Sequence, residues 1–421
     1  MAIESRDSKA LMTEFVEKRK FLIVAFLAAM TFCNLVMPIQ EIPSLQNGFQ
    51  DFTIYYMAGL LVRSGHAADL YNLATQYRTQ LTFAHVPIRQ GPLPYNHPAF
   101  EAILFVPFTL LGYWPAYILW TAFNLIMLAV SVILLRRQFP QLAAVSPLVL
   151  SLGATAFFPV ALGIFQGQDV MLLELLFVLA IISLDHGNDA TAGIFLATGL
   201  FLPHIIAPLA VLFAARSSRV LLGFVPVGVV LAGISIALTG WHKPLEYVQF
   251  VLHVENSGAT SYGPQVVPNL RGLIADLPGL GGAGSWLTLL VLVSSAVIFL
   301  FAFSRISKGR DPMLFVASLA AVTAILVSYH ALSYDLTLLL PSVLFLLSRT
   351  VGVETMNAER MKDETKIDAL TVVLLILLFL TPLYVFLVVV AQRFFLFSLV
   401  LLALYLMLVL TPASIEERAA A

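Results

Sequence analysis

The sequence predicts an all-α polytopic membrane protein built as one membrane-embedded domain. Of its 421 residues, 60% are hydrophobic and only 11% are charged, whereas soluble globular proteins carry about 25% charged residues. Runs of Leu, Val, Phe and Ala approach the ~20 residues that a helix needs to cross a bilayer. They are too long and too uniformly apolar for barrel strands, so we expect the spans to be helices.

We expect about ten to twelve helices and two elaborated loops, residues 41–96 and 241–284. The membrane domain is expected to cover residues 21–411, between a polar segment at 1–20 and a tail at 412–421. Two apolar segments are predicted to be broken or re-entrant helices. They are His97–Gly112, which is short for a span, and Phe195–Ala215, which carries two prolines and a histidine.

Basic clusters predict the orientation through the positive-inside rule. Lys18-Arg19-Lys20 precedes the first apolar run and is expected to stay cytoplasmic, so Asp51 emerges on the opposite, extracytoplasmic side. The other basic clusters fit the cytoplasmic side and lie at residues 136–137, 216–219, 305–310 and 359–366. By the same rule we expect both elaborated loops to be extracytoplasmic and the tail to be cytoplasmic.

Composition excludes some partners. The net charge of −1 gives no support for a nucleic-acid partner. The only cysteine, Cys33, lies within the first apolar run, so the chain cannot form an internal disulfide and we interpret this residue as a packing group.

The first candidate site lies at Asp51, Tyr55 and Tyr56, directly after the first span. Asp51 fits the N-cap of a helix. It also fits a carboxylate held at the membrane–water boundary, where it can act as a general base. The segment that follows, with Arg63, His66 and Asp69 among Leu and Ala, looks like an amphipathic helix on the membrane surface.

Two further candidates flank later spans. Asn96 and His97 precede an apolar run that contains Glu101, and the alternative for the motif is an ordinary helix start. Gln168 lies in the turn "FQGQD", which can equally be a polar turn between spans. His204, within an apolar run, is either a satisfied core histidine or part of this polar group.

The fourth candidate combines Asn269 and Arg271 with His330 and Asp335. Five residues on a continuous helix place two side chains about 140° apart, so a bent junction between His330 and Asp335 is expected. Arg271 can bind phosphate oxygens bidentately. The alternatives are a structural His–Asp pair and an ordinary loop arginine.

The succession of these motifs resembles glycosyltransferase family 87, bacterial membrane enzymes of the GT-C class. The resemblance extends over residues 50–350 and is carried, in order, by "DFTIYYMAGLLVRSG…LY", "NHPAFEAILFVPFTLL…AYILW", "GQD", "LPHIIAPLAVLFAARSSR", "PNLRGL" and "SYHALSYDLTLLLP". It implies a GT-C-like helical bundle in the bacterial inner membrane, whose extracytoplasmic first loop carries short helices.

The resemblance also implies an activity, namely transfer of one sugar, typically mannose, from a polyprenyl-phosphate donor to a lipid or glycan acceptor on the extracytoplasmic side. Asp51 stands where the family has its catalytic base, His330 where it has a histidine, and Asn269 to Gly272 on its outer-loop motif. The chain departs from the family at Leu202, where a lysine often precedes the proline.

The expected mechanism is inverting. Asp51 takes a proton from the acceptor hydroxyl, while Arg271 and His330 hold the donor phosphate. Because the chain has no D-x-D motif, we expect neither a metal nor a cofactor in transfer. The alternatives are a transporter or a flippase of lipid-linked glycans, and a non-catalytic assembly factor.

Overall fold

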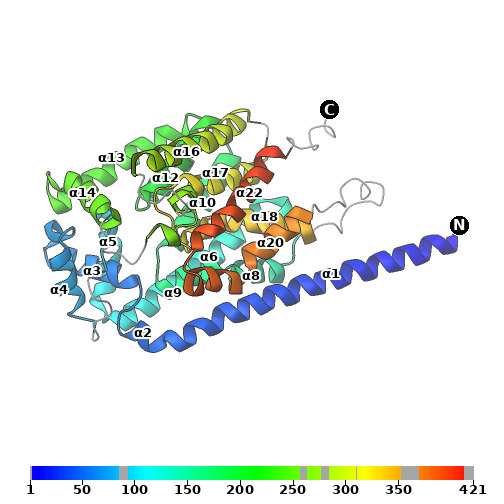
Figure 1. Ribbon diagram of the computed structural model, residues 1–421, viewed down its shortest axis with the longest axis horizontal. Coiled ribbons are helices and arrows are strands. Elements are labelled where there is room, and N and C mark those ends of the chain that lie inside the picture. The colour runs from blue at the N-terminus through cyan, green and yellow to red at the C-terminus, as the bar shows by residue number, and fades with distance from the viewer. Residues whose placement is uncertain are drawn as a thin grey trace.

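The computed structural model describes residues 2–84, 93–256, 263–275, 284–309, 311–351 and 369–411. Within these ranges helices are the only regular secondary structure, and there is no strand. Four helices are long and apolar enough to span a membrane, or up to six if each of two bent pairs is one span. The all-α polytopic membrane fold is therefore confirmed (Figure 1).

The candidate spans comprise single helices and bent pairs. The single helices are α1 (Ala2–Val36), α6 (Tyr113–Gln138), α13 (Val220–Thr239) and α16 (Gly284–Ser307). The bent pairs are α8 (Pro147–Ala156) with α9 (Phe158–Gln166), at 62°, and α20 (Ala369–Phe379) with α21 (Thr381–Val385) and the π-helix Phe386–Val390, at 60°. The expected count of ten to twelve stays a prediction, since length and composition alone identify four to six.

Shorter helices complete the bundle and the first loop. The apolar ones are α3 (Phe52–Arg63), α10 (Val170–Asp185), α11 (Asp189–Thr198), α12 (Pro203–Arg216), α17 (Met313–Val327), α18 (Leu340–Val351) and α22 (Ser398–Leu410). The others are α2 (Ile42–Gln46), α4 (Leu73–Gln80), α5 (Ala102–Phe105), α7 (Pro140–Ala143), α14 (Lys243–Asn256) and α15 (Leu270–Ala275). The 3-10 helices are Met37–Glu41, Ala67–Asp69, Ala99–Glu101, Pro107–Leu110, Pro264–Val266, Asp335–Leu339 and Phe394–Phe397.

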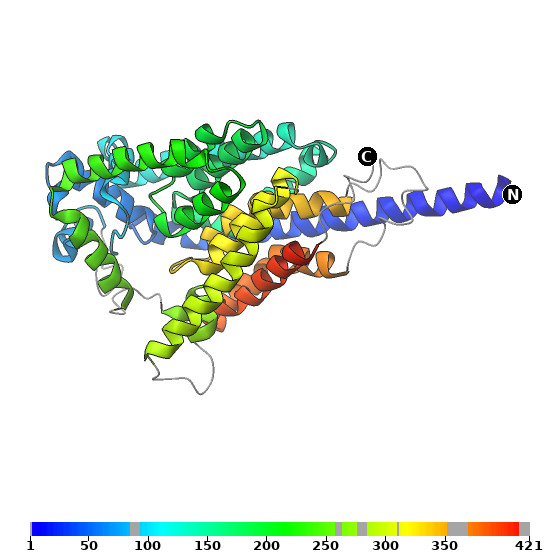
Figure 2. The same ribbon diagram turned by 90° about the horizontal axis from the view of Figure 1, so that it is seen from above.

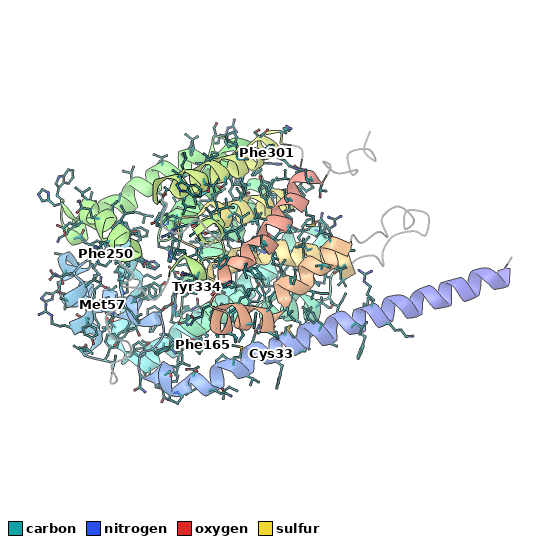
Figure 3. The ribbon with its side chains drawn as sticks, viewed as in Figure 1. Cys33, Met57, Phe165, Phe250, Phe301 and Tyr334 are labelled. Atoms are coloured by element: carbon teal, nitrogen blue, oxygen red, sulfur yellow. The ribbon has the colours of Figure 1, made fainter. Side chains whose placement is uncertain are left out.

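The buried apolar side chains form two clusters. The larger fills the bundle, and Cys33 on α1 packs against it (Figure 3). The smaller joins α3 to α5 and the start of α6 at one end of the molecule, with Phe52 and Tyr55 fully buried (Figure 1). The first loop is therefore a packed part of the fold, and burial of apolar area stabilises it.

The amphipathic surface helix expected after Asp51 is broken. Helix α3 ends at Arg63, and Gly65 follows in the left-handed region, with φ of 78°. The Arg63 guanidinium donates to the carbonyl of Thr109, which ties α3 to the neighbouring Pro107–Leu110 turn. Nearly all of α3 is buried, because it packs into the smaller cluster rather than lying on a membrane.

Both segments predicted to be broken are broken. His97–Gly112 consists of a 3-10 turn, the short α5 and a second 3-10 turn. Phe195–Ala215 is divided between α11 and α12 by the turn that precedes Pro203. Helix α11 crosses α13 so closely that a Cβ added at Gly193 would lie 1.9 Å from the carbonyl oxygen of Val220, a close approach that small residues permit between membrane helices.

The bundle has a basic end. There the Nη1 atom of Arg216 donates to the carbonyl of Asp311 at 3.0 Å, and the Arg305 guanidinium pairs with the Asp311 carboxylate, also at 3.0 Å. Arg19 on α1 donates to the carbonyl of Thr350 at the end of α18. Helices α16 and α22 run obliquely to α1 (Figure 2), yet their ends join this region too, because Arg305 also donates to the carbonyl of Val409.

Candidate active site

A tight turn at Gly167 joins α9 to α10. Gly167 adopts φ of 65°, and a Cβ added there would meet the Cβ of Phe52 at 2.7 Å. Helix α6 holds the turn. The Tyr117 hydroxyl donates to the carbonyl of Phe165 at 2.7 Å, and the Trp120 indole donates to the carbonyl of Gly167 at 2.9 Å. These two hydrogen bonds fix the orientation of the turn relative to α3.

Asp51 faces this turn. It occupies the N-cap position of α3, but its side chain makes no capping hydrogen bond. Its Oδ2 atom instead accepts a hydrogen bond of 2.7 Å from the Nε2 atom of Gln168. Its backbone amide donates to the Oε1 atom of Gln166 at 3.3 Å. Asp51 is 6% exposed. Its carboxylate binds the turn instead of capping α3.

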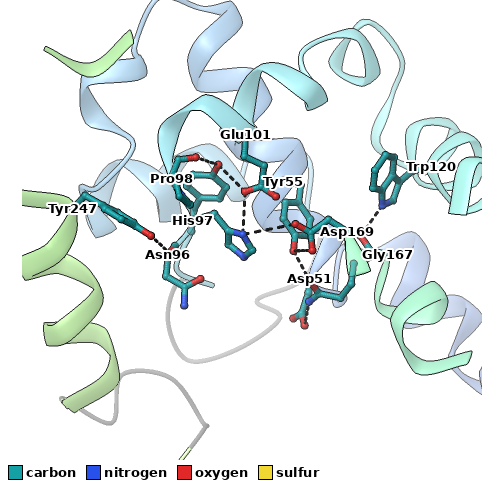
Figure 4. A network of polar contacts seen from close by, with 12 residues as sticks. Asp51, Tyr55, Asn96, His97, Pro98, Glu101, Trp120, Gly167, Asp169 and Tyr247 are labelled. Atoms are coloured by element: carbon teal, nitrogen blue, oxygen red, sulfur yellow. Dashed lines mark hydrogen bonds and ion pairs between the residues drawn. The ribbon is translucent and has the colours of Figure 1, made fainter. Parts of the chain in front are cut away.

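Tyr55 extends the contact inward. Its hydroxyl donates to the Oε1 atom of Gln168 at 2.5 Å and lies 3.4 Å from the Oδ1 atom of Asp169. Gln168 therefore uses its amide oxygen toward Tyr55 and its amide nitrogen toward Asp51. The result is a continuous polar chain from Asp51 to Asp169 (Figure 4).

His97, Glu101 and Asp169 form a buried cluster at the inner end of this chain (Figure 4). The His97 Nδ1 atom lies 3.0 Å from the Oε2 atom of Glu101 and 3.9 Å from the Oδ2 atom of Asp169. The Tyr95 hydroxyl donates to the same Glu101 oxygen at 3.1 Å. Burial raises the pKa of Glu101 to about 7 and that of Asp169 well above its usual range, and it lowers the pKa of His97.

The segment between α17 and α18 contributes a second polar group. The rings of His204 and His330 meet edge to face, with centroids 5.9 Å apart. The Oδ2 atom of Asp335 accepts a hydrogen bond of 2.7 Å from the backbone amide of Leu332, and burial raises the pKa of Asp335 to about 7. The bent junction predicted here is present, because α17 ends at Val327 before His330.

Asn269 and Arg271, in the second of the two predicted loops, contact the same segment. The Nδ2 atom of Asn269 donates to the carbonyl of Ser328 at 2.7 Å, while its Oδ1 atom accepts from the amide of Gly272 at 3.0 Å. The Arg271 guanidinium donates to the carbonyl of Tyr329 at 3.1 Å and stacks over the Tyr329 ring at 4.0 Å. Asn269 thus fixes its loop against the segment between α17 and α18. Arg271 contacts the same segment at Tyr329, which is next to His330 in the sequence.

Two predicted site residues belong to neither of these polar groups. Tyr56 donates its hydroxyl to the carbonyl of Leu111 at 2.8 Å, and its ring packs against Phe83 and Tyr113 in the smaller apolar cluster. Asn96 contributes only its carbonyl, which lies 3.4 Å from the hydroxyl of Tyr247.

Three network residues were absent from the predicted site, namely Tyr95, Glu101 and Asp169. Glu101 was noticeable as an acid inside an apolar run, and Asp169 as the residue that ends the turn just before one. An acid directly at the start of an apolar run was the available signal. The sequence gives no signal for Tyr95, because an aromatic residue beside a proline is common in loops.

Comparison with known proteins gives one match. The model of glycosyltransferase family 87 matches residues 95–328, more than half of the chain. The matched segment contains His97, Gln168, His204 and Arg271, whereas Asp51 lies before it. Neither the curated proteins nor the solved structures contain a significant match to the chain.

Proposed function

The chain belongs to glycosyltransferase family 87, and from this premise we propose that it is an inverting hexosyltransferase that takes its sugar from a polyprenyl-phosphate donor. The acceptor is a lipid or glycan, and mannose is the sugar that the family resemblance favours. The observation that carries this proposal is the Asp51 carboxylate, which is buried at a helix start, unused as a cap and held by Gln168. A carboxylate fixed in this way suits a general base.

The proposed reaction is a single displacement. Asp51 accepts the proton of the acceptor hydroxyl as that oxygen bonds to the anomeric carbon. The bond from this carbon to the donor phosphate oxygen breaks, and polyprenyl phosphate leaves with its electron pair. Arg271 and His330 hold the phosphate, and the Tyr55–Gln168 contacts keep Asp51 in position. Orientation of this kind lowers the barrier by removing rotational freedom before the reaction.

The basic end of the bundle supports placement of this chemistry on the extracytoplasmic side. Helix α12 connects His204 to Arg216, and α10 leads from Asp169 to Asp185, whose carboxylate accepts from Gln138 at 2.6 Å. The positive-inside rule assigns the arginine-rich end to the cytoplasm of a bacterial inner membrane.

A reporter inserted at Ser64, in the exposed turn after α3, tests this orientation. We expect it to respond as a periplasmic reporter, because Ser64 is on the same side as Asp51. A cytoplasmic response would remove the basis for an extracytoplasmic active site.

The proposed function is tested by supplying the purified protein with a panel of polyprenyl-phosphate sugars and, in parallel, nucleotide sugars. We expect a glycosylated acceptor, detected by mass spectrometry, only with polyprenyl-phosphate donors. Product from nucleotide sugars alone would contradict the donor class. Movement of intact lipid-linked glycan across reconstituted vesicles, without any new product, would favour the alternative transporter or flippase.

A further inference from the structure

We propose that His97, Glu101 and Asp169 form a binding site for one divalent transition-metal ion, Mn²⁺ or Zn²⁺, beside Asp51. The proposal departs from the expectation that transfer uses no metal. That expectation concerned an ion held by a D-x-D motif, which the chain lacks, whereas this ion would be held by other residues. The inference does not depend on the identity of the donor or the acceptor.

The geometry is that of a slightly open three-ligand site. The His97 Nδ1 atom and one carboxylate oxygen each from Glu101 and Asp169 lie within 4.8 Å of one another. The Nδ1 atom is 3.0 Å from Glu101 and 3.9 Å from Asp169. Ligand atoms about 2.1 Å from a shared ion stand about 3 to 3.5 Å apart, so a small movement of the Asp169 side chain would complete the arrangement.

Three polar atoms of this cluster, one on each residue, have no hydrogen-bond partner in the part of the chain that the structure describes. Glu101 is 2% exposed and Asp169 is fully buried, yet no N–H or O–H group among the described residues reaches the Oε1 atom of Glu101 or the Oδ2 atom of Asp169. The Nδ1 atom of His97 forms no aligned hydrogen bond either, despite its short distance to Glu101. Buried polar atoms are rarely left this way without a ligand, an ion or a water.

Charge balance points in the same direction. Two carboxylates buried side by side require a positive charge or shared protons, because unpaired buried anions are costly. A neutral imidazole is the form that binds metals, and a divalent ion would neutralise both carboxylates.

The ligand types narrow the choice of ion. Carboxylate oxygens suit Mn²⁺, and imidazole suits Zn²⁺, so a site with one nitrogen and two oxygens fits either better than Ca²⁺. The other oxygen of Asp169 lies near the Tyr55 hydroxyl, which contacts Gln168 and through it Asp51. The ion would therefore fix the inner end of the chain that orients Asp51.

Titration calorimetry with MnCl₂ and ZnCl₂ on the purified, chelator-treated protein tests the inference. We expect saturable binding of one ion per chain and a higher Tm with the ion present, because an ion that binds only the folded state stabilises it. Glu101→Gln and Asp169→Asn preserve shape and should each weaken binding at least tenfold. Glu174→Gln is the matched control, because Glu174 is a buried carboxylate on α10, the helix that begins directly after Asp169, and both its oxygens are unpartnered. This variant should bind the ion like the wild type.

Wild-type protein that shows no saturable binding of either ion would overturn the inference, whatever the variants do. Binding that survives both Glu101→Gln and Asp169→Asn would overturn it too. Unchanged or increased Tm of metal-free Glu101→Gln, together with no binding by the wild type, would assign the cluster to a shared proton. None of these measurements uses sugar transfer, so failure here is distinguishable from failure of the proposed function.

Discussion

Replacing Asp51 with Asn is expected to lower the rate of sugar transfer by about 100- to 10,000-fold, the usual contribution of a general base. The amide cannot accept the acceptor proton at neutral pH. Its oxygen can still accept the 2.7 Å hydrogen bond from Gln168, so the fold and the turn should persist. The measurement is the initial rate with labelled polyprenyl-phosphate sugar, alongside the Tm and the binding of the donor lipid.

The matched control is Asp69→Asn in the same loop, residues 41–96. Asp69 lies in the 3-10 turn after α3 and takes no part in the polar chain, so this variant should transfer sugar at close to the wild-type rate. If Asp51→Asn retains transfer within a few-fold of wild type, Asp51 is not the base. An equal loss in both variants would indicate damage to the loop instead.

Gln168→Leu is expected to reduce kcat by about 10- to 100-fold. The substitution removes a hydrogen bond to a charged group, worth about 1.5 to 3 kcal/mol, and each 1.36 kcal/mol of barrier is about tenfold in rate. It also removes the acceptor of the 2.5 Å bond from Tyr55. Because a carboxylate without its donor holds a proton more tightly, the acidic limb of the pH–rate profile should move to higher pH.

The pH profile separates positioning from simple destabilisation. A purely structural defect would lower the amount of active protein without moving the acidic limb. Gln138→Leu, at the opposite end of the bundle beside Asp185, is the matched control and should leave the profile unchanged. Wild-type kcat and an unshifted profile in Gln168→Leu would contradict a role for Gln168 in orienting Asp51.

The sequence predicted the features that depend on local composition. Low charge and long apolar runs identified the helical membrane fold, prolines identified the broken segment around Pro203, and the five-residue spacing identified the bend between His330 and Asp335. Asp51 was recognisable because it follows directly on the first span. Each of these signals lies within a short window, where periodicity and residue type decide the structure.

The contacts that complete the site were not predictable in this way. The hydrogen bond between Asp51 and Gln168 joins residues 117 positions apart, and no local pattern specifies such a pairing. Tyr56 looked equivalent to Tyr55, but their places on α3 direct one toward Leu111 and the other toward Gln168. The approach of Glu101 to Asp169 likewise depends on how the broken segment packs against the α9–α10 turn.

The anomeric configuration of the transferred sugar tests the central claim most directly. Direct attack by an acceptor hydroxyl that is activated by Asp51 requires inversion at the anomeric carbon, with no covalent sugar–enzyme intermediate. We therefore predict, from nuclear magnetic resonance of the purified product, the configuration opposite to that of the polyprenyl-phosphate donor. A product with the donor's own configuration would contradict the account.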